Sequence, residues 1–371
     1  MSTDHDSALY PADRLATAAR AVRAAGLGAL LLTPGPDLRY VTGYDAKQLE
    51  RLTCLAIPAE GDPFLLVPRL ELPAAQASPA SGLGVEMVAW GETEGPFGIV
   101  KNRLGTLASV GLSDRMWALH VLQFRAAFPA ATQELASTVL SPLRVRKSPA
   151  EVSALREAGA AIDRVHARVP QWLRPGRTER EVGAQIAEAI LGEGHVQVDF
   201  VIVGSGPNAA SPHHDISDRV MAQGDVVVVD IGGTMPSGYC SDCTRTYSIG
   251  QPPQDFAGYY GVLKEAQEAA CAAVRPGTAA QDIDRAAREI IAEAGYGDWF
   301  IHRTGHGIGL ESHEDPYIVE GNDARLAPGM AFSIEPGIYP GPHGARIEDI
   351  VVCTDDGVER LNNVTRELVI V

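Results

Sequence analysis

The sequence predicts an α+β protein of two domains, and three observations support this prediction. The chain has 371 residues, whereas a typical domain has about 150. Residues 8–145 alternate short apolar runs with amphipathic stretches, a pattern typical of an α/β domain. Residues 148–371 contain a helix-and-strand pattern that occurs twice. We therefore expect an α/β domain over 8–145, followed over 148–371 by a domain of two similar halves related by a pseudo-two-fold axis.

The first domain is predicted from its periodicity. An amphipathic helix over Arg14–Ala25 precedes four apolar runs that predict strands, at Ala29–Thr33, Thr53–Ile57, Phe64–Val67 and Val85–Trp90. The stretch Gly35–Tyr40 contains Gly and Pro, which predict a loop. No segment of this domain gathers His, Asp and Glu in its sequence, so we expect the chemistry to lie in the second domain.

The second domain starts with a helix signal. Ser148 is a good N-cap, Pro149 favours the first helical position, and Glu151 follows the serine by three residues, as in a capping box. Apolar residues then recur at helical spacing and line one face, at Val152, Leu155, Ile162, Val165 and Val169. We therefore place the domain boundary at residues 143–147.

The repeat within the second domain is visible in its turns. Arg174-Pro175-Gly176 recurs 101 residues later as Arg275-Pro276-Gly277. A Thr-x-x-Glu or Thr-x-x-Gln box follows each, at Thr178 and Thr278, and predicts the start of a helix. A pair of glycines is also repeated, Gly204 and Gly206 as Gly305 and Gly307.

Carboxylates occupy matched positions in the two halves. Asp230 ends the segment GDVVVVD, Glu335 ends the matching segment GMAFSIE, and one strand later Asp242 corresponds to Glu348. Chance similarity of two helix-and-strand units does not explain why acids align with acids beside apolar runs. A buried carboxylate is unfavourable unless it is paired or binds a metal ion, and four together repel one another. Because two divalent cations would balance four carboxylates, the pattern predicts a dinuclear metal site.

His306 adds a nitrogen ligand to this set. It lies in Thr304–Gly309, where glycines without a Cβ atom allow a close approach of backbone and substrate. One imidazole and four carboxylates form an oxygen-rich ligand set. Such a set favours Mn²⁺, Co²⁺ or Fe²⁺ over a structural zinc ion held by thiolates.

Other interpretations of these segments have weaker support. Cys240-x-x-Cys243 would be half of a zinc site or a redox pair, but the sequence has no second pair. His302 and His306 have the spacing of a helical zinc motif, but Arg303 stands where that motif has Glu, and the nearby glycines oppose a helix. Histidines without local partners are expected on the surface or in the core, namely His5, His120, His166 and His195.

Four motifs of the second domain resemble those of a known family. They are His302-x3-His306-x6-His313-Glu314, Ser333–Gly337, Gly344–Asp349 and Gly238–Thr246. Together they resemble the Xaa-Pro dipeptidase (prolidase) and Xaa-Pro aminopeptidase group of the pita-bread metallopeptidases, over residues 148–371. Residues 8–145 resemble, on weaker motifs, the creatinase-type N-terminal domain of that family. The resemblance implies a pita-bread fold for the second domain.

The resemblance also implies a role for each candidate metal ligand. By it, Asp230 holds one metal ion, His306 and Glu335 hold the other, and Asp242 and Glu348 bridge the two. Asp230 and Asp242 are 12 residues apart, one residue more than in many family members. An extra residue in the hairpin between them would absorb this difference. The expected metal is Mn²⁺, with Co²⁺, Fe²⁺ and Zn²⁺ as alternatives.

Further residues are implied to act on the substrate. His213 and His313 match the family's substrate-contacting histidines, and His302 matches a histidine that lines the same pocket. Glu335 would move a proton to the leaving proline nitrogen, while His213 and His313 would hold the scissile carbonyl or stabilise the charge on its oxygen. Arg346 lies two residues before a bridging acid, on the same side of an expected strand, and is the candidate for binding a substrate carboxylate. Neutralising the acidic site is the alternative role of Arg346.

The implied activity is that of a dinuclear-metal exopeptidase, which removes an N-terminal residue when proline follows it. Dipeptides are the expected substrates, and the alternative is an Xaa-Pro aminopeptidase that acts on longer peptides. A metal-free creatinase-like hydrolase or a noncatalytic binding module of the same fold would not need all five ligands. The family also implies a homodimer, in which the first domain of one subunit approaches the active site of the other.

The composition excludes several partners. There are 31 Lys and Arg residues against 47 Asp and Glu, a net charge of -16 that would repel nucleic acid and anionic membrane surfaces. No window approaches the roughly 18 apolar residues of a membrane span, and the polar N-terminal segment has no apolar signal core. The five cysteines are an odd number, so reduced thiols and a cytoplasmic location are expected.

Overall fold

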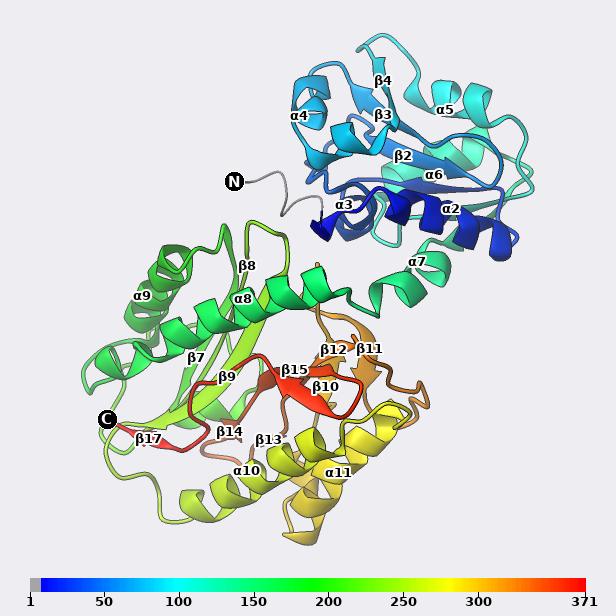
Figure 1. The fold of residues 1–371 in the computed structure, drawn as a ribbon. Helices are drawn as coiled ribbons and strands as arrows, with labels where there is room; N and C mark the ends of the chain where they lie inside the picture. Colours follow the sequence, from blue (N-terminus) through cyan, green and yellow to red (C-terminus); the bar gives the residue numbers. More distant parts are fainter. Residues whose placement is uncertain (1–7) are drawn as a thin grey trace. The chain divides into compact units, whose positions relative to one another are not determined.

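The computed structural model describes residues 8–371 of the chain. The chain divides into two compact units, Met1–Arg144 and Val145–Val371 (Figure 1). His5 lies outside the described residues. Within residues 8–371, no helix is both long enough and apolar enough to cross a membrane.

The first unit is built around a mixed six-stranded sheet. Its strands are β1 (Ala29–Leu32), β2 (Cys54–Pro58), β3 (Phe64–Pro68), β4 (Glu86–Trp90), β5 (Ser109–Leu112) and β6 (Thr132–Leu135), in the order β4-β3-β2-β1-β5-β6. Its helices are α2 (Asp13–Ala24), α3 (Pro36–Thr42), α4 (Leu72–Gln76), α5 (Pro96–Leu104), α6 (Ala118–Ala127) and α7 (Ser137–Arg144). The first helix and the four predicted strands are confirmed. Strands β1, β2 and β3 are buried along their whole length, which explains their unbroken apolar runs.

The loop predicted over Gly35–Tyr40 is wrong, because this stretch belongs to helix α3. Pro36 is the first helical residue, where its fixed φ is suitable and its missing N–H needs no partner. Gly43 ends the helix in the left-handed conformation, at φ 70°, and its amide donates to the carbonyl of Arg39. Gly and Pro therefore mark the two ends of a short helix here.

The first half of the second unit starts with the two expected helices, α8 (Pro149–His166) and α9 (Glu179–Gly192). Both predicted capping boxes form, between Ser148 and Glu151 and between Thr178 and Glu181. Of the predicted helical face, Val152 is half-buried and Leu155, Ile162 and Val165 are buried in α8. Val169 is also buried but lies beyond α8, in a short 3₁₀ helix, Val169–Gln171.

The second half starts with helices α10 (Phe256–Ala273) and α11 (Ala280–Glu293). The helix start predicted at Thr278 is confirmed, but Thr278 does not cap the helix, because α11 begins at Ala280 and has Ala279 at its N-cap. The Thr278 hydroxyl donates instead to the carbonyl of Ala273, and the Gln281 side chain accepts from the amide of Gly321. The side chains of Thr278 and Gln281 therefore bond to groups outside the helix and do not cap it.

Strands of the second unit form two larger sheets and one small one. The first sheet contains β7 (Gln197–Ser205), β8 (Val226–Thr234), β9 (Cys240–Ser248) and β17 (Val369–Ile370), in the order β17-β9-β8-β7. The second contains β10 (Gly305–Gly307), β11 (Glu314–Ile318), β12 (Ala331–Ile334), β15 (Asp349–Cys353) and β16 (Val358–Arg360), in the order β11-β10-β12-β15-β16. The small sheet pairs β13 (Gly337–Ile338) with β14 (Ala345–Arg346).

Each half of the second unit has its own core. Helices α8 and α9 lie beside strands β7, β8 and β9 (Figure 1), and apolar side chains of these elements form one core. Apolar side chains of α10 and α11 form another core with the strands of the second half. Each half runs in the order helix, helix, strands. The sequence repeat therefore corresponds to a repeat of structure.

Strand register brings the matched acids together. In the antiparallel pair β8–β9, Asp230 lies opposite Thr244 and Gly232 opposite Asp242, so Asp230 and Asp242 are diagonal neighbours on one face. The 12-residue spacing is compatible with this arrangement. Asp242 pairs with Gly232, which lies two residues from Asp230, and residues two apart in a strand point to the same face. In the pair β12–β15, Ile334 lies opposite Asp349, and Glu335 and Glu348 are the residues just beyond this end of the ladder.

Candidate metal centre

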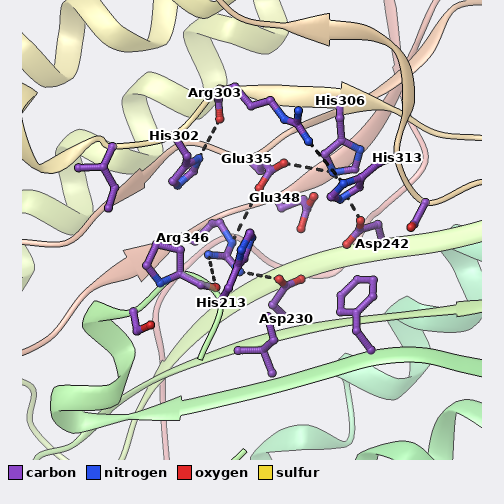
Figure 2. A pocket seen from close by; sticks show the side chains of 16 residues that line it. His213, Asp230, Asp242, His302, Arg303, His306, His313, Glu335, Arg346 and Glu348 are labelled. Atoms are coloured by element: carbon purple, nitrogen blue, oxygen red, sulfur yellow. Dashed lines mark hydrogen bonds and ion pairs between the residues drawn. The ribbon is translucent and has the colours of Figure 1, made fainter. Parts of the chain in front are cut away.

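All nine residues predicted for the site line one cavity of about 730 Å³ in the second unit. Figure 2 shows the labelled acids and imidazoles turned toward one another. The predicted residues are His213, Asp230, Asp242, His302, His306, His313, Glu335, Arg346 and Glu348. The remaining lining residues are Phe200, Ile202, Ser211, Pro212, Ile301, Arg303 and Ser312.

Three of the four acids form one group of possible metal ligands. Oxygen atoms of Asp230, Asp242 and Glu348 lie within 4.8 Å of one another, and all three residues are buried. Burial, together with the charges of neighbouring acids, raises the pKa of Asp242 and of Glu348 well above the ordinary values. Asp230 Oδ1 is buried and has no hydrogen-bond partner among residues 8–371. Bound cations would therefore stabilise the ionised forms of these three acids.

A second ligand group contains His306, Glu335 and Glu348, again with atoms within 4.8 Å of one another. His306 Nδ1 lies 3.1 Å from the carbonyl oxygen of Gly307. Because a carbonyl only accepts, Nδ1 carries a proton, and Nε2 is the ring nitrogen that faces the acids. Nε2 lies 3.2 Å from Glu335 Oε1 and 3.7 Å from Asp242 Oδ2.

Atoms of Asp242, His306 and His313 form a third such group. The first two groups fit hard divalent cations. They share Glu348, and between them they contain four carboxylates and one imidazole, with no thiolate. Carboxylate-rich sets with imidazole suit Mn²⁺, Co²⁺ and Fe²⁺. The unpartnered oxygen of Asp230 is an atom that a cation would satisfy, and Nε2 of His306, which faces the acids, is a nitrogen that could bind one.

Glu335 is held in its ionised form by its surroundings. Burial alone would raise the pKa of Glu335, but the hydrogen bond from His306 and the electrostatic attraction of His306, His302 and Arg346 lower it to about 2. The hydroxyl of Ser333 donates to Glu335 and accepts from the amide of His306. One serine thus links the two candidate ligands.

The glycines beside His306 are required by close backbone packing. A Cβ atom on Gly305 would lie 1.9 Å from the carbonyl oxygen of Ser333, and one on Gly307 would lie 2.1 Å from that of Asp315. Strand β10 therefore sits between β12 and β11 at a distance that only glycine permits. In this structure the close approach is of backbone to backbone.

Arg346 is buried and strongly engaged, with only 2% of its surface exposed. Nη2 donates to Asp230 Oδ2 at 2.5 Å, Nη1 to Tyr339 Oη at 2.9 Å and to the Pro212 carbonyl at 3.2 Å, and Nε to Thr244 Oγ1 at 3.1 Å. Protein atoms thus use four of the five N–H groups of the guanidinium.

The segment that leads to His306 is fixed by helix α11. Asp284 accepts from the amide and the hydroxyl of Thr304, and Arg288 donates to the carbonyl of His302. His302 Nε2 lies 3.0 Å from Tyr339 Oη. Burial lowers the pKa of His302, which favours the neutral ring.

Arg303 and His313 lie side by side along the cavity. Arg303 Nη2 lies 3.4 Å from His313 Nδ1, and its guanidinium stacks 4.5 Å from the ring of Tyr317. The rings of His313 and His306 are 3.8 Å apart. Burial, followed by the charges of His306 and Arg303, lowers the pKa of His313 to about 4.

Two of these residues were missed by the sequence analysis. Arg303 was considered only as an argument against a helical zinc motif, although it stands within the His302-x3-His306 string that carried the resemblance. Tyr339, which contacts both His302 and Arg346, belongs to no chemical motif.

The remaining histidines and the cysteine pair lie outside the cavity lining. His120, His166 and His195 are buried, and His214 donates to Glu179. His343 contacts Tyr259. The five cysteines are free and buried, and no cluster of possible metal ligands among residues 8–371 includes one.

Two family profiles together cover most of the chain. The profile of metallopeptidase family M24 matches residues 153–355, and that of the creatinase/prolidase N-terminal domain matches residues 14–146. The chain belongs to metallopeptidase family M24. The resemblance found in the sequence is therefore confirmed, and with it the expected fold class, a creatinase-type domain followed by a pita-bread domain. As a member of family M24 the protein is a metallopeptidase, and its family implies divalent metal ions.

Relatives in this family are similar along almost their whole length. The solved dipeptidase PepE of Mycobacterium ulcerans is 55% identical, with a TM-score of 0.93 and coverage of 99% of both chains. The solved prolidase of Thermococcus sibiricus is 37% identical, with a TM-score of 0.90 and coverage of 96% of this chain and 98% of that one. The Xaa-Pro dipeptidase of Lactobacillus helveticus is 37% identical over 347 residues, 90% of this chain and 92% of that protein.

Proposed function

We propose that this member of family M24 is an Xaa-Pro dipeptidase, which hydrolyses the bond between an N-terminal residue and the proline that follows it. The observation that carries the proposal is the pair of ligand groups that share Glu348 in one cavity. A cavity of about 730 Å³ suits a small ligand such as a dipeptide. Similarity to proteins named dipeptidase, prolidase and Xaa-Pro dipeptidase supports the substrate class.

Five side chains would hold two divalent cations, for which we propose Mn²⁺. Asp230 would hold one cation, His306 and Glu335 the other, and Asp242 and Glu348 would bridge them. The grouping of Asp230 and Asp242 with Glu348, and of His306 and Glu335 with Glu348, supports this division. When bound, the cations polarise the scissile carbonyl and make water a stronger nucleophile at neutral pH.

Proton transfer and charge stabilisation fall to three residues of the chain. Glu335, ionised in its surroundings, would take a proton from the attacking water and deliver it to the leaving proline nitrogen. His313, with a pKa near 4, is neutral at pH 7 and has an N–H group to offer the scissile carbonyl. His213 lines the same cavity and would hold that carbonyl or stabilise the charge on its oxygen.

The carboxylate of a dipeptide needs a cation, and the cavity offers two arginines. The sequence favours Arg346, but four of its N–H groups already have protein partners, one of them Asp230. These contacts support its alternative role, which is to neutralise the acidic site and to orient Asp230. Arg303, half-buried along the cavity, is therefore the candidate that the structure favours for the substrate carboxylate. His302 would line this part of the pocket through its contact with Tyr339.

The proposal extends to the whole protein. We propose domains at 8–145 and 148–371, a homodimer, and a cytoplasmic location. Five free, buried cysteines support a reducing compartment, and the net charge of -16 supports peptides rather than nucleic acid or membrane as partners. The dimer rests on the family resemblance, and sedimentation should give twice the mass of the chain.

Substrate length is tested with matched peptides. Protein loaded with Mn²⁺ is given Xaa-Pro and Xaa-Pro-Yaa substrates that share the same first residue, and kcat/KM is measured for each. The proposal predicts faster hydrolysis of the dipeptide. Faster hydrolysis of tripeptides and longer peptides would identify an Xaa-Pro aminopeptidase instead.

A further inference from the structure

A buried carboxylate outside the cavity lining, that of Glu179, organises the loop that carries His213. Glu179 is the first residue of helix α9, is 0% exposed, and accepts seven hydrogen bonds from four residues. All four donors belong to the segment 205–217, which follows strand β7, namely Ser205, Asn208, His214 and Ser217.

Both carboxylate oxygens are used: Oε1 accepts three of the bonds and Oε2 accepts four. Oε1 accepts from the amide of Ser205 at 2.8 Å and from its hydroxyl at 2.7 Å. Oε2 accepts from His214 Nε2 at 2.8 Å, and from the amide of Ser217 at 3.2 Å and its hydroxyl at 2.5 Å. Asn208 Nδ2 donates to both oxygens. Each oxygen therefore accepts from a backbone N–H group, that of Ser205 or that of Ser217. A backbone N–H group can only donate, so it needs an acceptor at this position.

The charge on Glu179 is maintained by this shell of donors. Burial alone would raise the pKa of Glu179, but the hydrogen bonds from Ser217, Ser205, Asn208 and His214 hold it below the ordinary value. Capping of helix α9 does not require this side chain, because Thr178 and Glu181 form the capping box. The Glu179 side chain thus bonds to the segment 205–217 and does not cap its own helix.

Neighbouring histidines of this loop take opposite roles. His213 lines the cavity, and His214 bonds to Glu179 (Figure 2 shows His213). The carbonyl of Pro212 accepts from Arg346 at 3.2 Å. The residues before and after His213 are thus both held, Pro212 through its carbonyl and His214 through its side chain. No hydrogen bond to another side chain or backbone group in residues 8–371 fixes the His213 ring itself, so its direction depends on these two anchors.

We propose that Glu179 is a positioning residue of the peptidase: through His214 and Ser217 it fixes the loop so that His213 points at the reacting carbonyl. This inference rests on the proposed function, in which His213 contacts that carbonyl. Glu179 touches neither the cavity nor the ligand groups, and it acts only through the loop.

The test is a double-mutant cycle on kcat. In Glu179→Gln, the amide –NH2 must face the N–H of either Ser205 or Ser217, so the loop loses an anchor. We expect kcat for Xaa-Pro to fall about 10- to 100-fold, because small misplacements of a catalytic group have effects of this size. His213→Ala should cost about 100-fold or more. If Glu179 acts through His213, adding Glu179→Gln to His213→Ala should leave kcat unchanged.

Control variants distinguish a loss of His213 positioning from a general loss of folding. Glu181→Gln makes the same chemical change two residues away on the same helix start, where the side chain is 58% exposed, and should keep kcat at the wild-type value. Bound metal per chain should be the same in all variants. A readout without activity is amide hydrogen exchange of the full-length protein, which should become faster at Ser205 and Ser217 in Glu179→Gln and stay unchanged in Glu181→Gln.

A milder variant covers the case in which Glu179→Gln does not fold. His214→Ala keeps the carboxylate and its other six hydrogen bonds, and should lower kcat less than Glu179→Gln while following the same non-additive cycle with His213→Ala. Full additivity with His213→Ala, or a fall in kcat that follows loss of metal, would overturn the positioning role. Wild-type kcat in His213→Ala would instead overturn the proposed role of His213.

Discussion

At the scale of single residues, the main feature of the site is a group of buried acids with too few neighbouring cations to balance their negative charge. Asp242 and Glu348 repel one another and Glu335, and Arg346 is the cation bonded to Asp230. Removing a ligand should therefore differ from removing a helper. Glu348→Ala should lose both bound metal and activity, because Glu348 belongs to both ligand groups.

His313→Ala provides the contrast with Glu348→Ala. It should keep its metal while kcat falls about 100-fold or more, the usual effect of losing a donor to a developing oxyanion. Elemental analysis and steady-state kinetics on both variants decide the matter. If His313→Ala also lost its metal, the division into ligands and helpers would be wrong.

The two arginines of the cavity give a second prediction about residues. Losing a charged hydrogen bond to a substrate carboxylate should cost about 1.5 to 3 kcal/mol, roughly 10- to 150-fold in kcat/KM. We expect Arg303→Met to weaken Xaa-Pro hydrolysis far more than Xaa-Pro-Yaa hydrolysis. Arg346→Met should weaken both alike, because its partner is Asp230. The reverse pattern would assign the carboxylate to Arg346, as the sequence alone suggests.

At the scale of elements, the position of His306 depends on how closely strand β10 packs between its neighbours. Gly305→Ala would place a Cβ atom 1.9 Å from the carbonyl oxygen of Ser333. We expect a loss of about 3 kcal/mol or more in unfolding free energy, together with weaker metal binding. Gly261→Ala is the matched control, since Gly261 lies in helix α10 with open space around it and should gain about 1 kcal/mol. Equal unfolding free energies for the two variants would contradict this account.

Elements that depend on local pattern were predicted well. Apolar runs located β1 to β4, and the Ser148 and Thr178 boxes located the starts of α8 and α9. The failures occurred where one local sequence signal is compatible with more than one structure. Gly and Pro mark a helix at residues 35–43 as readily as a loop, and Thr278 bonds to Ala273 instead of capping a helix.

The site residues also divide into those with a local sequence signal and those without one. The acids could be found because they interrupt or end apolar runs in matched halves, and register then brought them together. Tyr339 and Glu179 could not be found, since their importance comes from contacts with residues far along the chain, such as His302 and His214. The roles assigned to the site residues remain predictions, which the variants above test.

At the scale of the whole molecule, buried titratable groups set the pH dependence of stability. His166 is 1% exposed and bonds to Tyr247 and the carbonyl of Cys243. Burial, reinforced by the charge of Arg245, lowers its pKa from 6.5 to about 3. Below pH 6.5 the unfolded chain therefore takes up a proton that the folded chain refuses. The stabilising contribution of neutral His166 is complete above about pH 6.5 and is lost progressively toward about pH 3.

Replacing this histidine should flatten that pH dependence. Between pH 6.5 and pH 5 the wild-type protein should lose about 2 kcal/mol through His166, a loss that His166→Gln should not show. Denaturant unfolding of both proteins at the two pH values measures the difference in slope. Parallel curves would mean that His166 is not held neutral by the fold.

The most direct test of the dinuclear peptidase is metal stoichiometry measured together with hydrolysis. The protein is stripped with a chelator, metal content is checked by elemental analysis, and Mn²⁺ is returned in steps while Xaa-Pro cleavage is followed. Two overlapping ligand groups predict no activity without metal and activity that rises until two Mn²⁺ ions are bound per chain. Full Xaa-Pro hydrolysis by protein shown to contain no metal would contradict the account.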